Sequence, residues 1–191
     1  MSSNLLYPVF LKMDKLQLLV VGGGNVAAEK LGFLYKSSPN ANVTIVAKDL
    51  IAETRQLAEQ LNAKVFERDF EPGDLDGFDL AIAATGDNLL NQNIWQQAKA
   101  KRVLINVADT PTLCDFYLGG VVTKGDLKIA VSTNGKSPTL AKRIREFLED
   151  ILPEETNDLL QNLHEYRSQL KGEFKEKVKA MNELTSSLIK K

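Results

Sequence analysis

The sequence predicts an α/β fold: a doubly wound parallel sheet, then a small unit of one β-hairpin and one helix, then a helical C-terminal tail. Three observations support this prediction. Four apolar residues at 18–21 run directly into three glycines, as in a buried strand that turns into a helix. Strand-like and helix-like patterns alternate up to residue 107, which is typical of parallel sheets. After Pro111 the alternation stops, and two strand-like runs meet at a tight turn.

The first part of the chain alternates short apolar runs with apolar residues at helical spacing. The apolar runs predict strands over residues 16–21, 43–47, 65–66, 79–84 and 103–107. The helical spacing predicts helices over residues 24–37 and 50–61, and a third that begins after a cap at Asp87 or Asn88. Strands connected in this way form a parallel sheet with right-handed crossovers.

The glycine turn has the spacing G-x-G-x-x-A, with Gly22 and Gly24 as its glycines and Ala27 in the third position. The glycines allow a tight reversal and the close approach of a phosphate, and the free N–H groups of the following helix point at that phosphate. Because the motif follows a strand and opens a helix, it indicates a dinucleotide site on a Rossmann sheet. A glycine turn without a ligand is the simpler alternative.

The second part begins where the alternation stops. Strand-like runs over 116–123 and 127–132 flank residues 124–126, which suit a hairpin turn. Ser137 and Pro138 then predict a helix start, with serine at the N-cap and proline at the first helical position. Two amphipathic helices are expected beyond that helix. We therefore expect three parts, over residues 1–112, 113–150 and 151–191.

Composition limits the function classes. The chain has 191 residues, 43% of them hydrophobic and 26% charged, which is ordinary for a globular protein. A net charge of −1 gives no reason to expect a nucleic acid or an acidic membrane surface as partner. No apolar run is long enough to cross a bilayer, and the first residues do not resemble a signal peptide. The single cysteine, Cys114, fits a reducing compartment, so we expect a cytoplasmic protein.

Polar residues follow the strands that should flank the ligand. Lys48 and Asp49 come after the second strand, where an acidic residue would bind a ribose hydroxyl and a cation would suit a 2′-phosphate. The residues leave the choice between NAD and NADP open, and we favour NAD. Thr85 ends the fourth strand and would line the other side of the cofactor. A solvated turn is the alternative interpretation of each of these residues.

Asp109 follows the fifth strand, on the ligand side of the sheet. A carboxylate there could accept a proton while hydride leaves to a nicotinamide, or could coordinate a metal ion transiently. A turn-capping aspartate is the simpler alternative. The only histidine, His164, has no His or Cys partner nearby in the sequence, so no metal site is expected.

A candidate anion site precedes the helix that begins at Pro138. A turn feeds this helix N-terminus beside a cation, an arrangement that suits carboxylates. The candidate substrate-binding residues are Thr133, Gly135, Lys136 and Ser137. The alternative is a plain capped helix with a basic surface.

Six motifs in this order carry a family resemblance: YPVFL at 7–11, VVGGGNVA at 20–27, AIAAT at 81–85, NVAD at 106–109, LCDF at 113–116 and SPTLA at 137–141. Together they resemble the precorrin-2 dehydrogenase / sirohydrochlorin ferrochelatase family, the siroheme synthase module that occurs alone or fused to a methyltransferase. The resemblance covers residues 7–152, with a weaker match in the tail. Gly86 departs from the family pattern, in which two acidic residues follow the threonine.

The resemblance implies that precorrin-2, a reduced tetrapyrrole rich in carboxylates, is oxidised with NAD to sirohydrochlorin. Many members then insert ferrous iron, the co-substrate, to give siroheme, whereas some are dehydrogenases only. The family's acid–base residue corresponds to Asp109. Its cofactor contacts correspond to Asn25, Val26, Lys48 and Asp49. Members are homodimers, and the segment after the nucleotide domain forms much of their interface, which makes 113–150 a dimerisation unit.

Two other functions suit the same fold. One is a dehydrogenase of another small substrate, since fold alone does not determine the reaction. The other is a nucleotide-sensing regulatory module, which needs the glycine turn but neither Asp109 nor the helix after Ser137. Such a sensor usually ends its second strand in an acidic residue, where this chain has Ala47.

Overall fold

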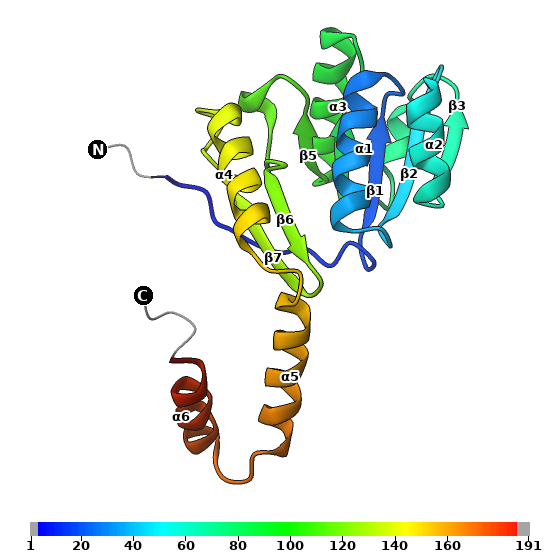
Figure 1. Cartoon of the computed structure of the whole chain (residues 1–191). Coiled ribbons are helices and arrows are strands. Elements are labelled where there is room, and N and C mark those ends of the chain that lie inside the picture. Colours follow the sequence, from blue (N-terminus) through cyan, green and yellow to red (C-terminus); the bar gives the residue numbers. More distant parts are fainter. Residues whose placement is uncertain (1–3, 187–191) are drawn as a thin grey trace. The chain divides into compact units, whose positions relative to one another are not determined.

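The computed structural model describes residues 4–186 (Figure 1). The chain forms two compact units. The first runs to Gly119 and includes Asn134–Lys136, and the second comprises Gly120–Thr133 and the chain from Ser137 onward. The expected division after residues 112 and 150 stays a proposal, and its outer ends, 1–3 and 187–191, lie outside the described residues.

The first unit contains the predicted parallel sheet, with strand order β3-β2-β1-β4-β5. The strands are β1 (Gln17–Val21), β2 (Asn42–Ala47), β3 (Lys64–Glu67), β4 (Leu80–Ala83) and β5 (Leu104–Val107). They are connected through the helices α1 (Asn25–Ser37), α2 (Ala52–Gln60) and α3 (Asn88–Lys101) and two short 3₁₀ turns, η1 (Pro72–Leu75) and η2 (Pro111–Leu113). All four strand pairings are parallel, so the carboxyl ends of the strands share one edge of the sheet. This confirms the predicted doubly wound fold.

The sheet is buried on both faces, which explains the unbroken apolar run in β1. Leu18 and Val20 belong to one hydrophobic cluster, which includes α1 and α2 residues. Leu19 and Val21 belong to another, which includes Ile94 of α3. Because successive strand residues point to opposite faces, each of the four apolar side chains finds a core.

Up to residue 186, the second unit contains an antiparallel hairpin and three helices. Its elements are β6 (Gly120–Lys124), β7 (Leu127–Val131), α4 (Pro138–Ile151), α5 (Thr156–Gln169) and α6 (Phe174–Thr185). Gly125 allows the hairpin turn because its φ is +56°. Ser137 caps α4 as predicted, since its hydroxyl accepts a hydrogen bond from the Leu140 N–H at 3.2 Å.

The first hairpin strand begins at Gly120, whereas the sequence pattern predicts that it begins at residue 116. The preceding residues are tied to the first unit. Asn106 Nδ2 donates to the Phe116 carbonyl at 2.8 Å, and the Tyr117 hydroxyl donates to the Pro111 carbonyl at 3.4 Å. The Phe116 carbonyl is thus used by a side chain of β5, and pairing with β7 begins only at Gly120, opposite Val131.

Within residues 4–186, no helix is both long and apolar enough to span a bilayer.

Candidate functional site

A pocket of about 440 Å³ opens at the carboxyl edge of the parallel sheet. It is lined by residues 21–26 of the glycine turn, 46–49 after β2, 68–70 after β3 and 84–86 after β4, together with Leu90. This is the topological switch point of the sheet, where β2 and β4 lie on opposite sides of β1. The volume lies within the range of about 300–1,000 Å³ that is usual for ligand pockets.

The three glycines have different structural roles. Gly22 has a φ of +123°, and a Cβ there would overlap the carbonyl oxygen of Ala84. A Cβ on Gly23 would overlap the carbonyl oxygen of Asp49. Around Gly24, by contrast, an added Cβ would meet no atom within 4 Å. The first two glycines therefore let strands pack closely, and the third leaves open space beside the start of α1.

The N-terminus of α1 is suited to an anion. Gly24 is its N-cap and offers no side-chain hydrogen bond, and the first turn of α1 contains no acidic residue. The N–H groups of a helix's first turn lack partners within the helix, and the helix dipole adds partial positive charge there. Asn25 and Val26 of this turn line the pocket. These features fit the phosphates of a dinucleotide.

A buried asparagine holds Thr85 at the rim of the pocket. Asn91 on α3 is 3% exposed. Its side-chain oxygen accepts hydrogen bonds from the Thr85 hydroxyl at 2.6 Å and from the Thr85 N–H at 3.2 Å, while its Nδ2 donates to the Thr85 carbonyl at 3.2 Å. Asp87 caps α3, since its carboxylate accepts from the N–H groups of Leu89 and Leu90. The turn after β4 is thus fixed by its own polar contacts.

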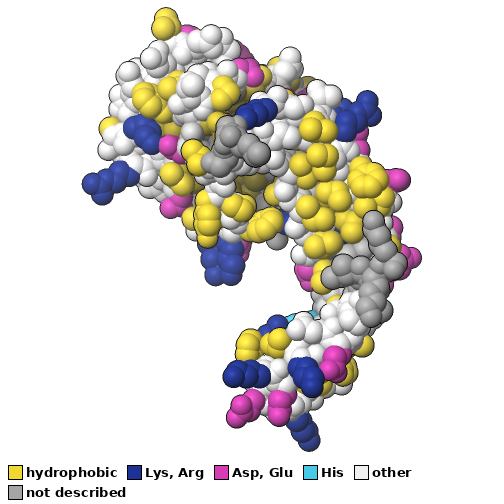
Figure 2. All heavy atoms as spheres, turned by 90° about the vertical axis from the view of Figure 1, so that its left-hand side faces the viewer, with side chains coloured by type: hydrophobic (Ala, Val, Ile, Leu, Met, Phe, Trp, Pro, Cys, Tyr) yellow, Lys and Arg dark blue, Asp and Glu magenta, His cyan; other side chains and the backbone are white. Residues whose placement is uncertain are grey.

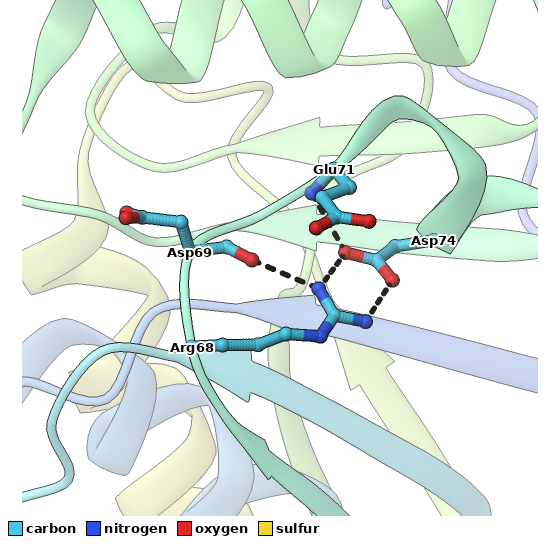
Figure 3. A network of polar contacts seen from close by, with 4 residues as sticks. All are labelled: Arg68, Asp69, Glu71 and Asp74. Atoms are coloured by element: carbon cyan, nitrogen blue, oxygen red, sulfur yellow. Dashed lines mark hydrogen bonds and ion pairs between the residues drawn. The ribbon is translucent and has the colours of Figure 1, made fainter.

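Charged residues form the rim beside β2 and β3. Lys48 Nζ lies 3.0 Å from a carboxylate oxygen of Asp69, and this contact raises the pKa of Lys48. Arg68 makes two hydrogen bonds to Asp74, at 2.8 and 2.5 Å, and a third to the Asp69 carbonyl at 2.8 Å (Figure 3). Asp49 also lines the pocket. The cations of this rim are therefore already paired with carboxylates.

Three of these lining residues, Arg68, Asp69 and Phe70, were not predicted as site residues from the sequence. They follow β3, which pairs in parallel with β2, so they share its carboxyl edge. The pattern around residues 65–66 predicted a strand but did not show that this strand pairs with β2. Knowledge of that pairing would have made the charged residues after β3 candidate site residues.

Asp74 should make stability depend on pH. Its side chain is 11% exposed, and the hydrogen bonds from Arg68 lower the pKa of its carboxyl. A lowered folded-state pKa stabilises the fold above the unfolded-state pKa of about 3.9, and this contribution is lost as pH falls through the folded value. We expect Asp74→Asn to lower the free energy of unfolding by about 1–2 kcal/mol at pH 7. Urea unfolding at several pH values should show this difference shrink below pH of about 4.

The control for this prediction is Asp76→Asn. The Asp76 side chain is 69% exposed and pairs with Lys101, so its loss should change the free energy of unfolding little at any pH. If Asp74→Asn were as stable as the wild type at pH 7, the Arg68 contact would contribute nothing measurable to the fold.

Asp109 lies at the same edge of the sheet but outside this pocket. It follows β5, which pairs with β4, and the Ala108 N–H donates to the Ala83 carbonyl at 2.9 Å. Asp109 is exposed and has a φ of +58°, a conformation that aspartate tolerates better than most residues. It is not among the lining residues because β4 separates β5 from the glycine turn. The structure therefore places this carboxylate on the β4–β5 side of the switch point.

Cys114 holds the segment that follows Asp109 against the end of β5. Its thiol donates to the Val107 carbonyl at 3.2 Å and accepts from the Val107 N–H at 3.2 Å. Burial raises the pKa of the Cys114 thiol, which disfavours the thiolate. The cysteine therefore has a packing role. Within residues 4–186, no group of three or more His, Cys, Asp or Glu residues could hold a metal ion.

The candidate substrate residues form the turn before α4. The Thr133 hydroxyl donates to the Ser137 carbonyl at 3.0 Å and accepts from the Ser137 N–H at 3.2 Å. Gly135 has a φ of +72°, which suits glycine. Lys136 follows directly and carries the positive charge of this turn. The turn is therefore held by its own hydrogen bonds next to the N-terminus of α4.

Family models and known relatives agree with this architecture. A model described as putative NAD(P)-binding matches residues 9–120, more than half of the chain. A second, described as sirohaem biosynthesis protein central, matches residues 124–151. The siroheme synthase of Pseudoalteromonas atlantica is 35% identical over 168 residues, which are 88% of this chain and 36% of that protein. The siroheme synthase of Nitrosococcus oceani is 37% identical over 164 residues, 86% of this chain and 35% of that protein.

A solved structure extends the similarity to almost the whole chain. The structure described as SirC, precorrin-2 dehydrogenase superposes with a TM-score of 0.75 and 26% sequence identity. The match covers 94% of this chain and 89% of that one. By contrast, the chain spans about a third of the length of the curated siroheme synthases that it matches. With its glycine turn, its parallel sheet and both matched models, the chain belongs to the putative NAD(P)-binding family found in siroheme synthases.

Proposed function

We propose that this protein oxidises precorrin-2 to sirohydrochlorin with NAD in siroheme biosynthesis. The observation that carries the proposal is the similarity to a precorrin-2 dehydrogenase over 94% of this chain and 89% of that one, at a TM-score of 0.75. The siroheme synthase relatives, 35% and 37% identical, support the same pathway. A nucleotide sensor or a dehydrogenase of another substrate is less favoured, because neither accounts for the match at residues 124–151.

The pocket at the glycine turn is the proposed NAD site. Open space beside Gly24 and the uncapped start of α1 fit the pyrophosphate, which Asn25 and Val26 would hold with their N–H groups. Lys48 and Asp49 lie where the adenosine ribose would be recognised, and Thr85 lines the opposite wall. When bound, the nicotinamide supplies the hydride acceptor.

Asp109 is the proposed proton acceptor. Its exposed carboxylate lies at the carboxyl edge of the sheet, beside the strand whose end lines the cofactor pocket. An ionised carboxylate can take the proton that the substrate releases from a different atom as hydride leaves the oxidised carbon. The turn before α4 is the proposed contact for substrate carboxylates, with Lys136 as the cation and Thr133, Gly135 and Ser137 as its neighbours.

An anaerobic assay tests this function. Precorrin-2 and NAD are mixed with the protein, and the appearance of sirohydrochlorin absorbance and of NADH is followed together. We expect both products in equal amounts, and neither without NAD. Folded protein that binds NAD but forms no sirohydrochlorin would contradict the proposed function.

Ferrous iron insertion into sirohydrochlorin is a second proposed activity. The exposed Asp109 carboxylate could accept the pyrrole protons that the metal replaces, and the siroheme synthase relatives favour this step. Iron is a substrate here and not a resident cofactor. Fe(II) or Co(II) should enter sirohydrochlorin faster with the protein than without it, and equal rates would leave a dehydrogenase only.

A homodimer is the proposed assembly. Leu140, Ile144, Phe147 and Ile151 follow one another at helical spacing along α4 and are 38–61% exposed. Figure 2 shows hydrophobic side chains gathered on the molecular surface, and such a patch is typical of an interface. Sedimentation should give twice the chain mass of 21.2 kDa.

A cytoplasmic location is proposed from the single, unpaired Cys114.

A further inference from the structure

We propose that Asp69 is the residue by which this chain prefers NAD to NADP, because its carboxylate occupies Lys48, the one lysine among the described residues that line the pocket. The inference deepens the proposed use of NAD and rests on it. It concerns a residue that the sequence motifs do not single out.

The location of Asp69 follows from strand pairing. β2 and β3 are parallel, with Ala47 beside Glu67, so the residues after both strands lie at the same edge. Lys48 and Asp69 both line the pocket, and their charged atoms lie 3.0 Å apart. In sheets of this kind, the end of the second strand is where the ribose 2′ position is read. The ion pair therefore lies where the two cofactors differ.

The second cation of the rim, Arg68, is not available for a phosphate. Asp74 binds it with two hydrogen bonds and also accepts the Glu71 N–H at 2.8 Å, as Figure 3 shows. The Asp74 side chain is only 11% exposed, so this contact is held firmly. The Lys48 and Asp69 side chains, in contrast, are each 70% exposed. Lys48 is therefore the cation that a ligand could recruit, and Asp69 is its competitor.

The charges at the rim disfavour a further anion. Among the lining residues, Lys48 and Arg68 carry positive charge, and Asp49 and Asp69 carry negative charge. A phosphate monoester adds about −1.5 to −2 at neutral pH, so it would meet both carboxylates and must displace one from Lys48. A ribose hydroxyl is neutral and can donate a hydrogen bond to a carboxylate. The arrangement thus admits the hydroxyl and opposes the phosphate.

The test is direct cofactor binding to the full chain with Asp69→Asn. Fluorescence titration gives the dissociation constants of NADH and NADPH for the wild type and the variant. We expect the ratio of the NADPH constant to the NADH constant to fall about tenfold, because Lys48 can then make a charge-assisted bond to the phosphate. No tetrapyrrole is needed, so the result stands apart from whether precorrin-2 is the substrate.

Glu67→Gln is the matched control. Glu67 ends β3, pairs with Arg55 at 2.9 Å on the surface and does not line the pocket. The substitution Glu67→Gln therefore removes the same charge from a similar ion pair. We expect no change in the ratio for this variant. In a Lys48→Met background, Asp69→Asn should lower the ratio by much less than tenfold, because only the repulsion between the carboxylate and the phosphate is then removed.

Four results would overturn the inference. They are an unchanged ratio in Asp69→Asn, an equal shift in Glu67→Gln, an equally large gain without Lys48, and wild-type protein that binds neither cofactor. The last result would also remove the proposed NAD site. Tight binding of NADH without precorrin-2 oxidation would contradict the proposed function alone.

Discussion

Replacing Asp109 with asparagine should lower precorrin-2 turnover by about 10²- to 10⁴-fold while NAD binding stays unchanged. The amide has nearly the shape of the carboxylate but cannot accept the substrate proton. Asp109 lies outside the glycine-turn pocket, so its loss should not disturb the cofactor. Turnover is measured as sirohydrochlorin formation, and binding is measured by NADH titration of the same preparation.

The fold of this variant should survive, because asparagine tolerates the left-handed φ of +58° as well as aspartate does. Asp14→Asn is the matched control. Asp14 is an exposed aspartate that precedes β1, at the opposite edge of the sheet. It should retain full turnover. Wild-type rates in Asp109→Asn would show that another group accepts the proton.

Replacing Gly24 with aspartate should weaken NAD binding by at least about 100-fold without weakening the fold. The φ of −88° suits any residue, and an added Cβ meets no atom within 4 Å. Aspartate is also a favoured N-cap, and α1 has no side-chain cap, so the free energy of unfolding could rise by about 1 kcal/mol. The same carboxylate would repel the pyrophosphate from the start of α1. NADH titration and thermal unfolding check the two halves of this prediction.

Gly24→Ser is the control, since serine caps the helix without adding charge and should bind NAD more tightly than the aspartate variant does. Gly22→Ala gives the opposite pattern. It should destabilise the fold itself, because it places a Cβ at a φ of +123° against the Ala84 carbonyl. If Gly24→Asp bound NAD like the wild type, the N-terminus of α1 would not be the phosphate site.

Local chemistry made much of the fold predictable. The apolar run at 18–21 predicted a strand buried on both faces, and both faces of β1 are covered. The sequence predicted helix starts after Asp87 or Asn88 and at Ser137, and the side chains of Asp87 and Ser137 accept hydrogen bonds from backbone N–H groups at the N-caps. Such signals are readable because helix caps and strand burial depend on neighbours within a few residues.

The hairpin boundary was less predictable. Residues 116–119 have a strand-like pattern, yet Asn106 and Pro111 hold them through hydrogen bonds to Phe116 and Tyr117. An apolar pattern favours a strand but does not show which backbone the segment bonds to. The site residues after β3 were missed for the same reason.

The order of residues alone predicted the alternating strands and helices of a doubly wound fold, the glycine turn and the capped helix after Ser137, because each of these depends on contacts close in sequence. Only the tertiary structure decided which charges share the pocket. It brings Lys48 against Asp69 and ties Arg68 to Asp74, since β3 pairs with β2. It also places Asp109 beyond β4, outside the pocket of the glycine turn. Strand order is set by long-range pairing of the whole sheet, which no local pattern encodes.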